Sequence, residues 1–367
     1  MLRDSVADFV TRATPMKRVR AMRTEHRECD AALWRQMAEL GWIGILVPER
    51  LGGLGLGIAE AAVVAEGLAG ALVPEPFTAV AVMAATALTH CGESALTDAL
   101  LSKLAAGELV AAMAWQENAG DVEVGSVITK AEPFEGGFRL NGTKRFVAGA
   151  PAAGGFIVSA RLNDAMALYW LPADLAGVGV KCEAVADSRQ FGTITLTDAL
   201  VPGTHQLATR SASLHALEAA RDAATLIASA ELLGVMKRAL DMSLEYMRTR
   251  VQFGKPIGSF QALQHRAVDL YVQQQLASAV LEDTLRRFGK ATNAAARAVL
   301  ASRLKARCSE AALRIVRETI QIHGAIGFTD EYDAGLYLKR ALVLSAWLGN
   351  AALHRRRYAR LHLEATV

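Results

Sequence analysis

Apolar and polar positions recur with two different periods along this chain, and the change of period divides the chain into three zones. From residue 1 to about 112, Ala and Leu recur at helical spacing, as in "ALWRQMAELGWIGILV" and "IAEAAVVAEGLAGAL". From about 113 to 212, short runs of β-branched and aromatic residues are separated by Gly, Asn, Asp and Pro. From about 213 the helical period returns and continues almost to the end.

This pattern predicts an α+β protein with three domains: an N-terminal helical domain (1–112), a small antiparallel β domain (113–212) and a C-terminal four-helix bundle (213–367). The short strands of the β domain are typical of a barrel or sandwich, and Asn141-Gly142 predicts a tight hairpin turn. Long helices of the bundle are expected over 216–250, 260–289 and 296–324.

Composition narrows the class of protein. The chain has 367 residues, of which 52% are hydrophobic and 21% charged, so it can form large cores and is not disordered. The net charge of +3 is mild and the basic residues are dispersed, which argues against a nucleic-acid partner. The exception is "HRRRYAR" (354–360), for which we favour a solvated helical face over a phosphate-binding patch.

Cysteines and apolar runs bear on the compartment. The four cysteines are far apart and form no CxxC pair, which favours a reduced compartment and no cysteine-based metal site. The N-terminus has no apolar signal region, and the longest weakly polar run (78–90) is too short to span a bilayer. We therefore expect a soluble cytoplasmic protein without a membrane partner.

Two glycine-containing segments interrupt the long helices: "RTRVQFGKPIGSFQALQH" (248–265) and "QIHGAIGFTDEYDAGLYLKR" (321–340). Glycine lets a ligand approach the backbone, and helix ends offer free N–H groups to an anion. Arg250, just before the first turn, is a suitable bidentate partner for a phosphate. The alternative is that both segments are ordinary turns between helices with C-cap glycines.

Five segments, found in order across the three zones, resemble the acyl-CoA dehydrogenase family: "LGWIGILVPERLGGLGLG", "LNGTKRFVAGAPAAGGFIVSAR", "LTDALVP", "RVQFGKPIGSFQ" and "QIHGAIGF". The resemblance covers nearly the whole chain. It implies the three-domain fold above, FAD as cofactor and α,β-dehydrogenation of an acyl-CoA thioester. It also implies an assembly of two dimers, with an electron-transferring flavoprotein or a similar protein as electron acceptor.

The resemblance also implies which residues bind FAD. Arg250 would contact the pyrophosphate across a subunit interface, with Phe253 and Gln261 near the adenine. Gln321 and the backbone of 322–325, which includes Gly324, would hold the pyrophosphate and ribose.

Other positions depart from the family's pattern. Ala325 replaces the second glycine of a Gly-Gly pair, and Phe146 takes the place of the aromatic residue, often Trp, that packs on the flavin ring. Ala148 replaces a Thr or Ser, so one hydrogen bond to the flavin is lost. For these positions the alternative is an ordinary residue of the β domain.

The catalytic base of the family is missing from both of its usual positions. "SAWLGN" aligns with the family's Glu-Gly-Thr turn, so that Gly349 and Asn350 keep places beside the flavin while Leu348 replaces the glutamate. The family's other base position, on the first long bundle helix, is Ala224. Removal of the weakly acidic α-proton needs a positioned carboxylate of raised pKa, and neither side chain supplies one.

Three carboxylates on the same helix are possible substitutes. Glu231 lies seven residues after Ala224, on the same face and about 10 Å further along the helix. Asp222 and Glu218 lie off that face. A buried, paired carboxylate is the alternative for Glu231.

The resemblance is nearest to the short, base-poor subunits of bacterial heteromeric acyl-CoA dehydrogenases, which act with a larger, base-bearing homologue. One alternative is a relative that became a flavin monooxygenase, and another is a non-catalytic scaffold without flavin. The phosphate-binding residues at the two glycine turns argue against the scaffold.

The substrate is indicated only in outline. Small side chains over 219–230 leave room for a bulky acyl group in the pocket that the resemblance implies. Arg221, nearly on the face of Ala224, is a possible partner for a second substrate carboxylate. We favour the alternative, a salt bridge between Arg221 and Glu218.

Overall fold

The computed structural model describes residues 1–120, 122–291 and 293–364. The chain forms two compact units. The bundle unit comprises 1–19, 62–73 and 225–367, and the sheet unit comprises 20–61 and 74–224. The long helix α7 (Arg210–Thr249) begins in the sheet unit and continues into the bundle unit.

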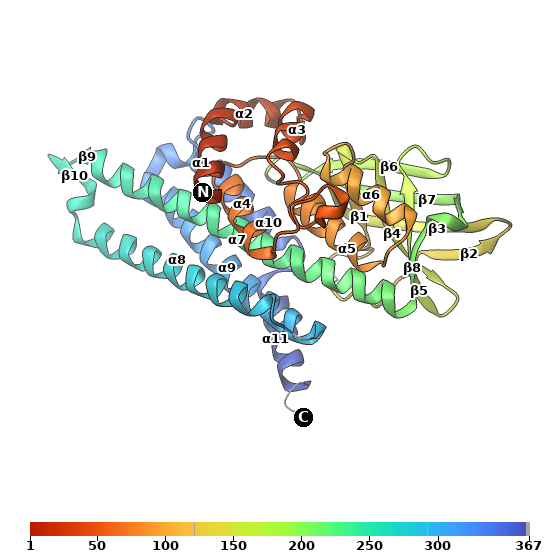
Figure 1. The fold of residues 1–367 in the computed structure, drawn as a ribbon. Helices are drawn as coiled ribbons and strands as arrows, with labels where there is room; N and C mark the ends of the chain where they lie inside the picture. The colour runs from red at the N-terminus through yellow and green to blue at the C-terminus, as the bar shows by residue number, and fades with distance from the viewer. Residues whose placement is uncertain (121, 292, 365–367) are drawn as a thin grey trace. The chain divides into compact units, whose positions relative to one another are not determined.

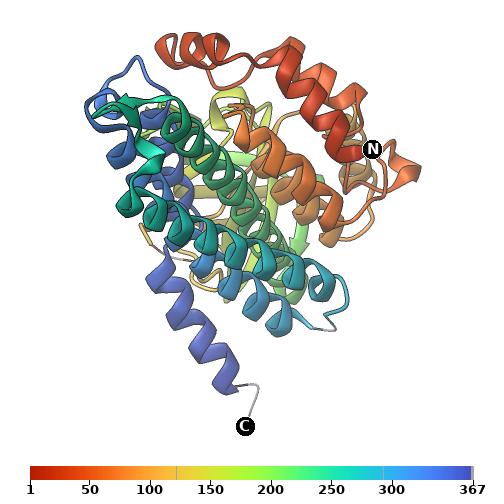
Figure 2. The same cartoon turned by 90° about the vertical axis from the view of Figure 1, so that its left-hand side faces the viewer.

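The predicted long helices of the bundle are confirmed, within a few residues at each end. Helices α8 and α9 lie side by side, and α10 and α11 also pack on α9 (Figure 1, Figure 2). The C-terminal half of α7 joins them, because the Ser243 hydroxyl lies 3.0 Å from that of Thr319 on α9. The remaining helical elements of this unit are α1 (Leu2–Ala13), the end of α4 (Ile58–Gly70), η5 (Ile257–Ser259), α8 (Gln261–Phe288), α9 (Ala294–His323), η6 (Gly324–Phe328), α10 (Ala334–Ala346) and α11 (Ala351–Glu364).

Helices α4 and α7 cross at close range because of a glycine. A Cβ atom built on Gly234 would lie 2.0 Å from the carbonyl oxygen of Glu66. No other residue fits there without moving one helix. Beside this crossing, the Lys237 ammonium lies 2.7 Å from the Glu66 carboxylate.

The sheet unit contains one eight-stranded sheet with the strand order β6-β7-β3-β2-β4-β5-β8, and β1 also pairs with β4. The α+β fold class is therefore confirmed, although β1 and β2 both run parallel to β4 while the other pairs are antiparallel. Apolar side chains such as Leu140, Phe156 and Tyr169 form the core of the sheet. The strands are β1 (Ala111–Ala114), β2 (Lys130–Phe134), β3 (Gly137–Ala148), β4 (Gly155–Leu162), β5 (Ala165–Pro172), β6 (Val178–Ala184), β7 (Gln190–Pro202) and β8 (Gln206–Thr209).

The hairpin turn predicted at Asn141-Gly142 is wrong. Both residues lie inside β3, where the pairing with β7 shifts register between Leu140 and Gly142. The Asn141 amide instead donates to Asp198 across the sheet, at 3.0 Å. Glycine is needed at 142 for close approach, since a Cβ there would lie 2.5 Å from the Thr129 hydroxyl. An Asn-Gly pair thus marks a β-bulge here rather than a turn.

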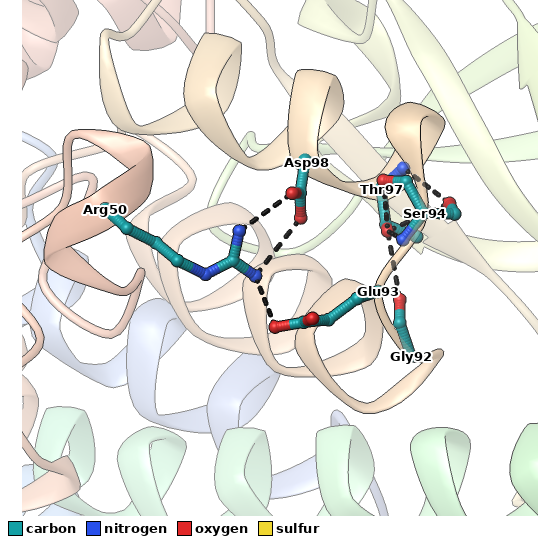
Figure 3. Close-up of polar contacts among 6 residues, drawn as sticks. All are labelled: Arg50, Gly92, Glu93, Ser94, Thr97 and Asp98. Atoms are coloured by element: carbon teal, nitrogen blue, oxygen red, sulfur yellow. Dashed lines mark hydrogen bonds and ion pairs between the residues drawn. The ribbon is translucent and has the colours of Figure 1, made fainter.

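Short helices complete the sheet unit, and Figure 3 shows how two of its segments are joined. Arg50 donates to Asp98 at 2.7 Å and to Glu93 at 2.8 Å, linking η1 to the start of α6. Helix α6 begins with a capping box between Ser94 and Thr97. The helical elements are most of α2 (Met16–Thr24), α3 (Ala31–Glu39), η1 (Glu49–Leu51), the π-helix η2 (Thr78–Ala84), α5 (Ala85–His90), α6 (Ala95–Ala105), η3 (Ala150–Ala152) and η4 (Gly203–His205).

The basic segment 354–360 is only partly a solvated face. Arg355 and Arg356 are exposed, but Arg357 is buried and donates to the Ser302 hydroxyl at 2.9 Å. The prediction was wrong for Arg357 because this side of α11 packs on α9. Throughout the parts of the chain that the structure describes, every helix is too short or too polar to cross a membrane.

Candidate functional site

The turn at 347–350, where the sequence predicts Leu348 in place of a glutamate, lies between α10 and α11. Helix α10 ends at Ala346, and Leu348 adopts a φ of +60° before Gly349 at +101°. Leu348 is also buried, with 3% of its surface exposed. A positive φ is strained for leucine, and such strain persists only where the surrounding structure enforces it.

Side chains from two helices enforce this turn. Lys305 on α9 donates to the carbonyl oxygens of Leu344 and Trp347, the latter at 2.8 Å. His354 on α11 lies with Nε2 2.8 Å from the Leu348 carbonyl oxygen, and since a carbonyl only accepts, Nε2 carries the proton. The Asn350 side chain accepts from the backbone N–H of Leu353 at 2.9 Å and so caps α11.

The role of Lys305 was not predicted from the sequence. Its side chain is fully buried, and burial lowers its pKa to about 7. An available signal was its place in a core stripe of α9, with Ala301, Cys308 and Ala312 at helical spacing. A lysine in such a stripe needs a specific partner, and here the partners are backbone carbonyls at the end of α10.

The possible substitute bases are all on α7, and two of them have firm partners. Glu231 is buried and accepts a hydrogen bond from Arg340 on α10. Asp222 is buried and receives two hydrogen bonds from Arg221, at 2.9 and 3.0 Å. Glu218 is half-buried, and Ala224 is fully buried.

The prediction that Arg221 forms a salt bridge with Glu218 was wrong. Arg221 pairs with its neighbour Asp222 instead of Glu218, and it also donates to the Val122 carbonyl at 3.2 Å. Helical spacing favoured the residue three positions away, but burial of both Arg221 and Asp222 makes the adjacent pairing the better one.

The first glycine segment forms a small hairpin, β9 (Val251–Gln252) and β10 (Lys255–Pro256), between α7 and α8. Arg250 and Gln261 flank it, and both are exposed. Phe253, at its tip, is 92% exposed and has a φ of +53°. Its ring stands edge-on to that of Phe260, with 6.1 Å between the ring centroids.

The second glycine segment follows α9. Gln321, Gly324 and Ala325 are all exposed, and a Cβ on Gly324 would meet only open space. Behind them, His323 is buried and its Nδ1 lies 2.7 Å from the Thr319 carbonyl, while the Tyr332 hydroxyl lies 2.8 Å from Nε2. The carbonyl requires the proton on Nδ1, so the Tyr332 hydroxyl donates to Nε2.

Two predicted flavin contacts lie at the end of β3 in the sheet unit. Phe146 is 39% exposed, has a φ of +57° and lies in a bulge of the sheet, while Ala148 is half-buried. Two residues before Phe146, Lys144 is fully buried and donates to Glu117 at 2.7 Å and Ser159 at 3.0 Å. This buried network holds the strand that presents Phe146.

Comparison with known proteins identifies the family. Residues 1–108 match the acyl-CoA dehydrogenase N-terminal domain, and 212–363 match the acyl-CoA dehydrogenase C-terminal domain. The acyl-CoA dehydrogenase IpdE2 of Mycolicibacterium smegmatis is 32% identical over 345 residues, which are 93% of this chain and 91% of the relative. The chain belongs to the acyl-CoA dehydrogenase family. As a member it is an oxidoreductase, and FAD is the cofactor of this family.

Three further acyl-CoA dehydrogenases are similar to this chain. FadE27 of Mycobacterium tuberculosis is 29% identical, over 97% of this chain and 94% of the relative. Among solved structures, the ChsE4–ChsE5 complex from Mycobacterium tuberculosis has a TM-score of 0.90 at 27% identity, covering 99% of this chain and 96% of that one. The steroid acyl-CoA dehydrogenase Tcur3481–Tcur3483 has a TM-score of 0.87 at 28% identity, covering 100% and 97%.

Proposed function

We propose that this chain is the base-poor subunit of a heteromeric FAD-dependent acyl-CoA dehydrogenase. In this role it contributes FAD-binding groups, while a larger homologous subunit supplies the carboxylate that removes the α-proton. The observation that supports this proposal is the turn at 347–350. The turn is fixed by Lys305, His354 and Asn350, although Leu348 cannot accept a proton.

The residues at the two glycine segments fit FAD. Arg250 offers a guanidinium for a pyrophosphate, Phe253 an exposed ring for an adenine, and Gly324 an open backbone for phosphate oxygens. When bound, FAD accepts the β-hydrogen as hydride. Gly349, Phe146 and Ala148 are the further residues proposed to lie against the flavin.

Arg250 provides a direct test of this assignment. Replacing it with alanine should lower the FAD content of the purified protein, since the pyrophosphate loses its cation. Arg248, also exposed and in the last turn of α7, is the matched control and its alanine variant should retain FAD. Equal FAD loss in both variants would indicate a general charge effect and contradict the assignment.

A heteromeric assembly is supported by the solved complexes. ChsE4 and ChsE5 form a complex of two subunits, and this chain aligns over nearly its full length with a chain of that complex. A partner with an intact glutamate would provide the base that Leu348 and Ala224 do not. Electrons would then pass to an electron-transferring flavoprotein or a similar acceptor.

The function is tested by anaerobic titration of the FAD-loaded chain with a panel of acyl-CoA thioesters, following the flavin spectrum. For the chain alone we expect perturbation of the spectrum on binding, without reduction. Co-expression with a larger, glutamate-bearing homologue should restore bleaching. Bleaching of the chain alone would show that it contains its own base, and Glu231→Gln would then identify or exclude Glu231.

A different outcome would favour the monooxygenase. In that case no thioester would perturb the flavin in either preparation, and oxygen would be consumed only when a flavin reductase and its reductant supply reduced flavin.

A further inference from the structure

A buried ion pair connects α7 and α10 within the bundle unit. Arg340 donates to Glu231, and the two residues are only 5% and 8% exposed. We propose that this pair recognises a hydrogen-bonding oxygen at the far end of the acyl group. The proposal rests on the proposed function, because it takes the acyl chain to start near the two base positions of the family.

The register of α7 places Glu231 on the substrate side. Ala224, Ala228 and Glu231 follow one another at spacings of four and three residues, so they share a face of the helix. Seven residues correspond to about 10 Å along the helix axis. Glu231 therefore lies about 10 Å beyond the position that bears the base in some relatives.

The register of α10 places Arg340, the partner of Glu231, at a similar distance from Leu348. Arg340, Leu344 and Trp347 are spaced by four and three residues, and Leu348 comes next. Arg340 is therefore also about 10 Å from the turn, towards the start of its helix. The two helices thus lead from the two base positions and meet at the ion pair, at a distance that roughly eight chain carbons would cover.

Several of the side chains between these points are small. The first turns of this stretch of α7 carry Ala223, Ala224, Ala228 and Ala230, which are the smallest side chains available apart from glycine. The ion pair ends that stretch with two large charged groups. An alkyl end would have to lie against these charges, whereas an oxygen can hydrogen-bond to them.

Energetics favour a recognition role over a purely structural one. A buried ion pair contributes little net stability compared with apolar residues of similar volume, because both charges lose their hydration. The guanidinium of Arg340 can donate to a keto, hydroxyl or carboxylate oxygen, and Glu231 can accept from a hydroxyl.

Arg221, the cation that the sequence offered for this purpose, is less suitable. Its guanidinium is held in a bidentate pair with Asp222 and by the Val122 carbonyl. We therefore assign recognition of a second polar group on the substrate to Arg340. Its partner Glu231 lies seven residues, or about two helical turns, after Ala224.

The test compares three thioesters of equal chain length on the FAD-loaded chain: octanoyl-CoA, 8-hydroxyoctanoyl-CoA and the carboxylate-ended suberyl-CoA. Dissociation constants come from the flavin spectrum. We expect the wild type to bind at least one oxygen-ended thioester about tenfold or more tightly than octanoyl-CoA, as one well-placed hydrogen bond to a charged group would give. The tighter of the two identifies the oxygen.

The decisive variant replaces both charges at once, Glu231→Leu with Arg340→Met, so that no unpaired charge is left to unfold the bundle. This double variant should bind octanoyl-CoA at least as tightly as the wild type and lose the preference for oxygen. The control is Lys237→Met with Glu66→Gln, which removes another ion pair of α7 and should leave the preference intact.

Two failures are distinguishable. If the wild type has no preference for oxygen, or the double variant keeps it, the recognition proposal is overturned while the dehydrogenase function stands. If no thioester binds to any variant, the proposed function itself fails.

Discussion

Lys144 in the sheet unit and Lys305 in the bundle unit are both fully buried, yet they are accommodated in different ways. Lys144 has a carboxylate partner, Glu117, at 2.7 Å. Burial lowers its pKa to about 8, against the opposing effect of Glu117. Lys305 donates to two backbone carbonyls, and burial lowers its pKa to about 7.

The difference separates two uses of a buried amine. An ion pair such as Lys144–Glu117 holds side chains of the sheet together. Burial alone would raise the pKa of Glu117, but hydrogen bonds from Lys144 and Thr129 keep it below its usual value. Lys305 instead fixes backbone, and a neutral amine has just two N–H groups for its two carbonyl acceptors. Lys305 therefore stabilises the backbone conformation of the turn that contains Leu348.

The largest expected effect is on the rate of flavin reduction, when a carboxylate is introduced at Leu348. Leu348→Glu places a carboxylate at the position proposed to correspond to the family's glutamate, on a turn that side chains of α9 and α11 already fix. If the turn is pre-organised, the chain alone should reduce its flavin with an acyl-CoA roughly 10² to 10⁴ times faster than the wild type, as general base catalysis contributes. Leu348→Gln is the control of equal size, and stopped-flow reduction rates provide the measurement. Equal rates for the two variants would show that the turn is not poised for proton removal.

Removing the amines should distinguish the two lysines by stability. Lys144→Met leaves Glu117 without its cation in a buried site, which should cost about 3–5 kcal/mol of unfolding free energy. Lys305→Met leaves two neutral backbone carbonyls without a hydrogen-bond donor, rather than an unpaired charge. It should lower the free energy of unfolding by about 1–2 kcal/mol. Urea denaturation measures both. The exposed pair of Lys181 with Glu183 is the control, and Lys181→Met should change stability little. A larger loss for Lys305 than for Lys144 would contradict this distinction.

The pH dependence of stability should sharpen the comparison. Both lysines have folded-state pKa values below that of the unfolded chain, so the unfolded chain binds more protons at alkaline pH, and these groups increase stability as pH rises. The increase should begin near pH 7 for Lys305 and near pH 8 for Lys144, at no more than about 1.4 kcal/mol per pH unit. Comparing each Met variant with the wild type from pH 6 to 10 isolates each contribution. If the difference in unfolding free energy between the wild type and a Met variant became less favourable to the wild type as the pH rises, the prediction would be contradicted.

The smallest effect is expected at Asn350. Asn350→Ala removes the cap of α11 and should cost about 1 kcal/mol, while Asn350→Asp keeps an acceptor and should cost less. Thermal unfolding of the two variants tests this. If the two variants were equally destabilised, the side chain would act through something other than the cap.

Periodicity predicted the elements better than it predicted their contacts. The long bundle helices follow from helical spacing sustained over many residues, and the structure confirms them. Asn141-Gly142 was misread because the same dipeptide serves a turn or a bulge, and only the partner strand decides between them. The parallel pairing of β1 and β2 with β4 is likewise set by tertiary contacts.

The local structure around Leu348 was predictable from the sequence. Gly349-Asn350 indicated a break in the helix, and the structure has α10 end at Ala346 and α11 begin at Ala351. The role of Leu348 stays a prediction. Lys305 lies more than forty residues before the turn that it holds, so no local pattern relates the two. Glu231 and Arg340 are 109 residues apart in the sequence, so no local pattern relates them. The sequence indicated that Glu231 could be buried and paired, but not with which residue.

The division of the bundle unit also bears on how the protein is synthesised. This unit draws on 1–19, 62–73 and 225–367, so its first two segments leave the ribosome long before the third. The sheet unit, complete by residue 224, can fold earlier. Until α7 is synthesised, the side of α4 that contacts Gly234 is uncovered. The two helices can pack only once Gly234, which has no side chain, is in place. During translation this surface of α4 lacks its native partner, and transiently exposed surface of this kind is prone to non-native contacts.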